Sequence, residues 1–91
     1  MDRALLISYL QAAEDRVAVI EQQIANQRDV ISSLRRAGHD TSSASAQLNV
    51  MEQTHMQYVG DRDRLRDELA MLSAAQLGNR RRIRRTPDGR R

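Results

Sequence analysis

The chain has 91 residues, 15 of them basic and 12 acidic, so its formal net charge is +3, and only 2% of its residues are aromatic. The sequence contains no Cys, which excludes disulfides and thiolate chemistry, and no Phe or Trp, so any core is built from aliphatic side chains and Met. No stretch approaches the roughly 20 apolar residues that a membrane-spanning helix requires. Ala, Leu, Gln and Arg, all good helix formers, are abundant, and the composition predicts a small, soluble, cytoplasmic, all-α protein.

A first helix is predicted over about residues 2–37. Apolar residues recur there at alternating spacings of four and three, which is the a/d pattern of a helix that packs along a single seam. Gln27 is the one polar interruption of this seam. The residues expected to build it are Leu6, Leu10, Ala13, Val17, Ile20, Ile24, Ile31 and Leu34.

A turn is predicted at residues 38–41. Gly38 suits the left-handed position just after a helix C-terminus, and either Asp40 or Thr41 can cap the next helix by accepting hydrogen bonds from its first N–H groups. Because the stop and start signals lie so close together, the two helices should fold back as an antiparallel hairpin. His39 beside Asp40 could orient an imidazole or bind a metal, but two adjacent groups do not form a coordination sphere, and capping already accounts for Asp40.

A second helix is predicted over about residues 42–77, again with alternating spacings of four and three. Two polar residues, His55 and Arg62, interrupt its seam. The stem of Arg62 is expected to cover Ile20 while its head reaches Glu21 or water. The apolar residues of this second seam are Leu48, Met51, Tyr58, Leu65, Leu69 and Leu72.

The two seams can be paired by residue number. When residues whose numbers add up to 82 face each other, every a position faces a d position, as antiparallel packing requires, and Gln27 faces His55. This pairing predicts a polar layer inside a coiled-coil hairpin. The layer could act as a pH-sensitive lock, because histidine changes charge near neutral pH, or it could only fix the register of the helices.

Association with another chain is expected because a single hairpin leaves much of each seam residue exposed, and small scaffolds often gain stability by associating. The sequence predicts a homodimer of hairpins that forms a four-helix bundle, or the docking of a partner helix. Four apolar residues beside the seam could meet such a partner: Ile7, Val30, Met56 and Val59. Gly60 could mark the close approach of another chain. The rival architecture is one long helix in a parallel coiled coil.

Residues 79–91 form the sharpest change of composition. Residues 1–78 carry eight arginines against eleven acidic residues, a net charge of −3, whereas residues 79–91 carry seven arginines against Asp88 alone, a net charge of +6. The chain therefore divides into a hairpin over residues 1–78 and a disordered basic tail. The tail could bind a phosphate backbone or another anionic surface, or serve only as a solubilising end. Its basic residues are Arg80, Arg81, Arg82, Arg84, Arg85, Arg90 and Arg91.

No motif for catalysis is present: the sequence has neither a Gly-rich phosphate loop nor an HExxH metal motif. A two-helix hairpin also offers no concave pocket that could exclude water from a reaction. We therefore expect a non-enzymatic protein without cofactor or metal that acts by self-association or protein–protein interaction. The alternative is a small nucleic-acid-associated protein that binds phosphates through its tail.

The run QRDVISSLRRAGHDTSSASAQLNVMEQTHMQYVGDRDRLRDEL and the opening MDRALLISYL together resemble a group of small proteins from proteobacteria. In that group a first helix ends near a Gly-His-Asp-Thr turn and a second ends in an Asp-Arg-Leu stretch. The matching residues here are Gly38, His39, Asp40 and Thr41, followed by Asp63, Arg64 and Leu65. The resemblance covers about residues 1–70 and implies a bacterial helical hairpin. The group has no assigned activity, so the resemblance implies no chemistry.

Overall fold

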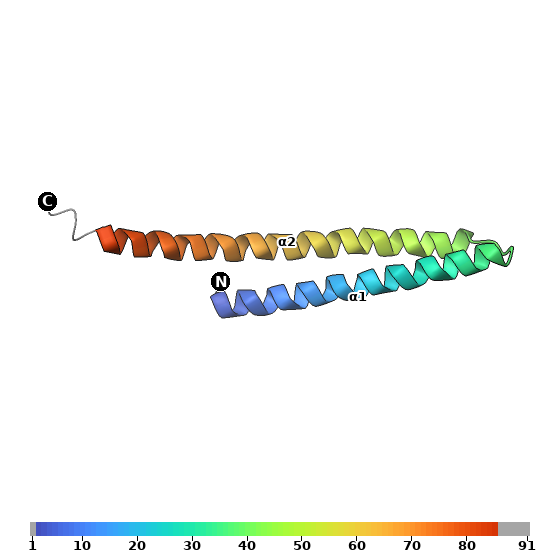
Figure 1. The fold of residues 1–91 in the computed structure, drawn as a ribbon, viewed down its shortest axis with the longest axis horizontal. Helices are drawn as coiled ribbons and strands as arrows, with labels where there is room; N and C mark the ends of the chain where they lie inside the picture. The colour runs from blue at the N-terminus through green and yellow to red at the C-terminus, as the bar shows by residue number, and fades with distance from the viewer. Residues whose placement is uncertain (1, 86–91) are drawn as a thin grey trace.

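The chain folds into two long helices that run side by side in opposite directions (Figure 1). This computed structural model describes the backbone of residues 2–85 and the side chains of residues 2–77. Helix α1 comprises Arg3–Arg36 and helix α2 comprises Ser42–Arg85, with 34 and 44 residues. At 1.5 Å per residue they are about 51 Å and 66 Å long. The predicted all-α helical hairpin is confirmed, and the rival architecture of one continuous helix is wrong.

Helix α1 ends at the predicted stop signal. The backbone N–H of Gly38 donates to the carbonyl of Arg35 at 3.1 Å, and that of His39 donates to the carbonyl of Leu34 at 2.9 Å. These two bonds satisfy carbonyls that the end of a helix leaves without partners. They require Gly38 to adopt φ of +78°, a left-handed conformation that glycine accepts without strain. Gly38 therefore sets the point at which the chain leaves α1.

Helix α2 begins with contributions from both predicted capping residues. The carbonyl of Thr41 accepts a hydrogen bond from the N–H of Ser45 at 2.8 Å. The Asp40 carboxylate accepts bonds from the hydroxyl of Ser42 at 2.7 Å and from its N–H at 3.0 Å. Because the Ser42 hydroxyl and the N–H groups of Ser42 and Thr41 favour the ionised carboxylate, the pKa of Asp40 is lowered from its ordinary value of 3.8.

The core is a single row of α1 side chains. Six apolar residues are buried: Leu6, Ala13, Val17, Ile20, Ile24 and Ile31. The other predicted seam residues are half-buried: Leu10, Leu34, Leu48, Met51, Tyr58, Leu65, Leu69 and Leu72. Among the described residues, α2 contributes no side chain as deeply buried as those of α1. Its seam contains larger and more polar residues, such as His55 and Arg62, whose ends reach solvent.

The helices pair in a register different from the predicted one. Each side-chain hydrogen bond that the described residues make between α1 and α2 joins residues whose numbers add up to 80 or less, not to 82. The cause lies in the connection, because α1 ends at Arg36 and α2 begins at Ser42. The midpoint of the turn is thus at residue 39 rather than residue 41, which shifts the pairing by about one layer.

Helix α2 continues to Arg85, so the predicted end at residue 77 is wrong. Gly78 and Asn79 weaken a helix, but arginine favours it, and Pro87 is the first residue that cannot continue the hydrogen-bonding pattern. Of the tail predicted to be disordered, residues 79–85 are helical and residues 86–91 lie outside the described residues. The last turns of α2 extend beyond the N-terminus of α1 (Figure 1).

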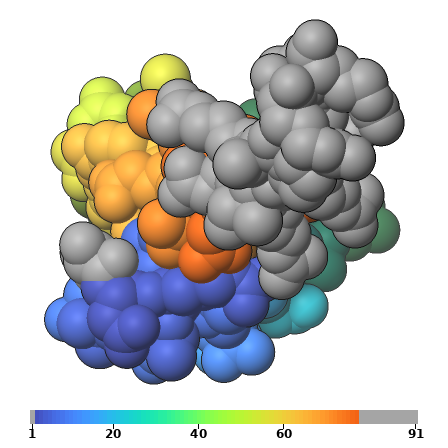
Figure 2. Space-filling model, turned by 90° about the vertical axis from the view of Figure 1, so that its left-hand side faces the viewer, coloured from blue at the N-terminus to red at the C-terminus, as the bar shows by residue number. Residues whose placement is uncertain are grey.

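The hairpin is only one helix thick. The chain measures 81 × 22 × 14 Å, and a single helix with its side chains is about 10–12 Å across. Seen end-on, the N-terminal part of α1 lies directly against α2 (Figure 2). The helix pair therefore has two broad faces, and no further element among the described residues covers either of them.

Candidate interaction surface

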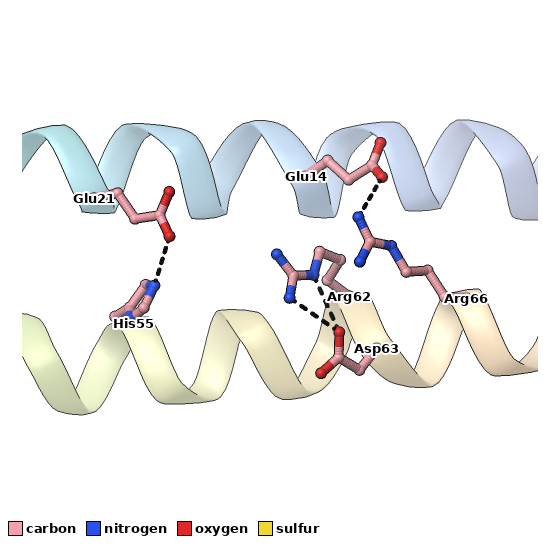
Figure 3. Close-up of polar contacts among 6 residues, drawn as sticks. All are labelled: Glu14, Glu21, His55, Arg62, Asp63 and Arg66. Carbon is pink, nitrogen blue, oxygen red and sulfur yellow. Dashed lines mark hydrogen bonds and ion pairs between the residues drawn. The ribbon is translucent and has the colours of Figure 1, made fainter.

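The contacts between oppositely charged or titratable side chains of the two helices cross one of the two faces, which we name the ion-pair face. The contacts join Glu14 Oε2 to Arg66 Nη2 at 3.1 Å, Glu21 Oε2 to His55 Nε2 at 3.1 Å, and Arg28 Nη2 to Glu52 Oε2 at 3.0 Å. Glu14, Glu21 and Arg28 are seven residues apart, so they occupy one stripe of α1. Figure 3 shows the first two carboxylates pointing from α1 toward α2. Both arginine pairs are solvent-exposed, and such pairs contribute about 0–1 kcal/mol each.

The polar layer predicted from Gln27 and His55 does not form. The Nε2 of Gln27 donates to the carbonyl of Ala44 at 2.9 Å and to Oε1 of Gln47 at 3.1 Å. Gln47 and His55 are eight residues apart, or about 12 Å along α2, so the two predicted partners are held at different levels of the hairpin. His55 instead contacts Glu21. The contact of His55 with α1 is therefore an exposed polar pair on the ion-pair face rather than a layer inside the seam.

The head of Arg62 contacts neither of the groups that the sequence suggested for it as alternatives, Glu21 or water alone, because it is paired with a neighbouring aspartate. Its Nε and Nη2 each lie 3.1 Å from Oδ1 of the neighbouring Asp63 (Figure 3). The side chain of Arg62 is 22% exposed, so its stem lies within the seam while its charged head is neutralised locally. Asp61 is neutralised in the same way by Arg64. Neither arginine forms an anion site with other described basic residues.

The opposite face, which we name the apolar face, carries most of the exposed large apolar side chains. Two shallow depressions on it contain residues of both helices. One of about 300 Å³ is lined by Asp15, Arg16, Val19, Ile20, Gln23 and Tyr58. The other is lined by Tyr9, Ala12, Arg16, Asp61, Arg64 and Leu65. In a helix with an a/d seam, residues seven apart lie on the same side of the helix. Four further exposed apolar residues stand seven or fourteen residues from residues that line the depressions and so lie on the same face. These are Leu5 and Val30 on α1 and Val50 and Met71 on α2.

The residues that flank the seam differ in exposure between the two faces. On the ion-pair face Ile7, Glu14, Glu52 and Val59 are half-buried, whereas Glu21, Arg28 and Arg66 are exposed. On the apolar face Thr54 is half-buried, whereas Tyr9, Arg16, Gln23, Val30, Gln47, Asp61 and Glu68 are exposed. The seam is therefore the more open on the apolar face.

Of the four apolar residues beside the seam that were predicted to meet a partner, only Val30 lies on the apolar face. Ile7 and Val59 stand seven residues before Glu14 and Arg66 and so belong to the ion-pair face. Met56 stands beside the same stripe and is 72% exposed. A Cβ added to Gly60 would meet no atom of this chain within 4 Å, so nothing in the hairpin itself explains that glycine.

The remaining predicted residues bring no chemistry together. The Asp40 carboxylate is occupied by Ser42, and His39 is exposed. Among the described residues, no group of three or more His, Cys, Asp or Glu could hold a metal ion. The predicted anion-binding arginines all lie where the structure describes no side chains, and Arg90 and Arg91 lie outside the described residues altogether.

The fold and its surface thus define a helical hairpin with one polar and one apolar face. No described helix is long and apolar enough to cross a membrane. Comparisons with protein families, with curated proteins and with solved structures find no match.

Proposed function

We propose that the chain is a non-enzymatic helical-hairpin protein that acts by self-association or by contact with another protein chain. The observation that supports this most directly is the apolar face, which carries six of the eight exposed large apolar side chains among the described residues, namely Leu5, Tyr9, Val19, Val30, Val50 and Met71. Contiguous exposed apolar surface on a small protein commonly marks an interaction site.

The total surface of the chain supports the same proposal. The accessible surface is 7132 Å² for a mass of 10.4 kDa. A compact monomer of that mass exposes about 5,400 Å², so the hairpin exposes roughly 1,700 Å² more. The excess follows from the single helical layer, because most domains bury the apolar side of one layer against a second.

Sedimentation equilibrium and thermal unfolding over a range of protein concentrations test the proposal. A self-associating hairpin should give a species heavier than 10.4 kDa, and its Tm should rise with protein concentration because association stabilises the folded chain. A single 10.4 kDa species with a Tm independent of concentration would contradict self-association.

Nucleic-acid binding through the basic tail is the second candidate function. Segregation of charge supports it, since residues 79–91 carry a net charge of +6 whereas residues 1–78 carry −3. The course of α2 supports it too, because the helix carries its arginines past the N-terminus of α1 (Figure 1). A duplex DNA probe should then bind with a logarithmic salt slope of about −4.5 if five phosphates are neutralised. Loss of binding in Arg80→Gln/Arg81→Gln/Arg82→Gln is expected, and a full-length chain that binds no probe at low salt would contradict this candidate.

A further inference from the structure

We propose that the apolar face is covered by a second copy of this chain, placed by a two-fold axis that passes near Val19 and runs perpendicular to the helices. In this arrangement α1 packs antiparallel against α1 of the second copy, α2 packs against its counterpart, and the two turns lie at opposite ends. The inference rests on the proposed function and names its partner, its surface and its geometry.

The placement of apolar residues along α1 supports a two-fold axis at this level. Val19 is 57% exposed at the middle of the apolar face. Tyr9 stands ten residues before it and Val30 eleven residues after it. An antiparallel second copy therefore sets Tyr9 opposite Val30 of that copy and Val19 opposite itself. Such self-complementarity is what an isologous dimer interface requires.

Helix α2 shows the same symmetry about the same level. Val50 stands eleven residues before Asp61 and Met71 stands ten residues after it. The two centres lie at about the same level of the hairpin, because the ion pairs Glu14–Arg66 and Arg28–Glu52 join residues whose numbers add up to 80, as do those of Val19 and Asp61. One two-fold axis thus pairs the apolar residues of both helices at once.

The distribution of charge favours antiparallel over parallel copies. In the antiparallel arrangement Arg16 faces Gln23 of the second copy, an uncharged residue, and Asp61 at the centre of α2 is already neutralised by Arg64. The arrangement also separates the basic ends of the two α2 helices, each followed along the chain by further arginines. Copies with both turns at one end would instead place the C-terminal ends of both α2 helices, which belong to two segments of net charge +6, at the same end of the bundle.

The area available is sufficient for a stable dimer. The face over which α1 and α2 overlap is about 51 Å long and 22 Å wide, so covering it on both copies removes about 2,200 Å² in projection. Permanent homodimers bury about 2,000–5,000 Å² or more, so coverage of the whole apolar face reaches that range.

Cysteine cross-linking tests the geometry directly, because the native chain contains no Cys. Under mild oxidation, Val19→Cys should form a covalent dimer by itself. Tyr9→Cys and Val30→Cys should each stay single, because like positions lie about 30 Å apart along the bundle, but a mixture of the two should cross-link. Met56→Cys, on the ion-pair face, is the matched control and should not cross-link. A disulfide between Tyr9→Cys and Met71→Cys chains, or one formed by Met56→Cys as readily as by Val19→Cys, would overturn the arrangement.

Mass measurements separate a failure of this inference from a failure of the proposed function. Val19→Asp should be a 10.4 kDa species under conditions in which the native chain and Met56→Asp both have twice that mass. A native dimer that survives Val19→Asp but dissociates in Met56→Asp overturns the assigned face while self-association stands. A native chain that is monomeric and gives no cross-link at any of these positions removes this inference and the self-association part of the proposed function, and leaves contact with a different protein chain as the remaining part.

Discussion

The substitutions Gly60→Ala and Gly38→Ala make the same chemical change and are expected to shift stability in opposite directions. A Cβ at either position would meet no atom within 4 Å, so packing inside the hairpin does not distinguish them. Backbone conformation does, because Gly60 lies inside α2 whereas Gly38 has φ of +78°.

The expected magnitudes follow from these conformations. In a helix interior, alanine is more favourable than glycine by about 1 kcal/mol, so Gly60→Ala should stabilise the chain by that amount. In the left-handed conformation a side chain costs about 1–2 kcal/mol, so Gly38→Ala should destabilise it by that amount. For a chain of this length, 1 kcal/mol corresponds to a change in Tm of roughly 4–8 °C.

Thermal unfolding followed by far-UV circular dichroism measures both changes. The native chain and the two variants must be compared at one protein concentration, because association alters Tm. The Tm is expected to rise for Gly60→Ala and to fall for Gly38→Ala. A fall in both would refute the reasoning at Gly60, since it would mean that a second chain approaches that part of α2, outside the apolar face. No change at Gly38 would show that the left-handed turn is not needed to join the helices.

Three further predictions concern the cap, the core and the ion-pair face. The lowered pKa of Asp40 means that its ionised carboxylate stabilises the fold above the ordinary pKa of 3.8, and that this contribution is lost as the pH falls through the lowered pKa. The difference in Tm between the native chain and Asp40→Asn should therefore be present near pH 6 and should shrink steadily as the pH is taken below 3.8. Ile24→Ala, at a position 7% exposed, should cost about 2–5 kcal/mol in denaturant unfolding, whereas Met56→Ala should change stability by no more than about 0.5 kcal/mol. A double-mutant cycle of Glu14→Gln with Arg66→Gln should give a coupling of about 0.2–1 kcal/mol that shrinks in high salt; a coupling unchanged by salt would contradict a solvent-exposed pair.

The turn could be predicted from the sequence because its signals are local. Gly38 is the residue type that a left-handed position needs, and Asp40 and Thr41 are residue types that cap helices. The sequence left the choice between Asp40 and Thr41 open, and the structure uses the carboxylate of one and the carbonyl of the other. The seam positions could be predicted for the same reason, since a spacing of four and three specifies one side of a helix whatever that side packs against.

The register and the difference between the two faces could not be predicted in the same way. A periodic seam can pair with another after a shift of one layer, so the rule that every a position faces a d position does not by itself select the register. The match of Gln27 with His55 that follows from a sum of 82 is not made in the structure. The end of α2 differs from the prediction because a change in composition at residue 79 is not a signal that ends a helix. Charge composition alone does not stop a helix when no breaker precedes Pro87.

Charges on the ion-pair face match the register that the connection between the helices sets. Along α1 an acidic residue, Glu14, precedes a basic one, Arg28, and along α2 the acidic Glu52 precedes the basic Arg66, so antiparallel helices match opposite charges at both levels. Sliding α2 by seven residues would place Val59 or a serine opposite each α1 charge and remove both pairs. Because individual pairs of this kind are weak, they act by disfavouring the wrong registers more than by stabilising the right one. Charges that select the register are confined to one face, which leaves the other face able to keep the apolar residues that a second layer of helices requires.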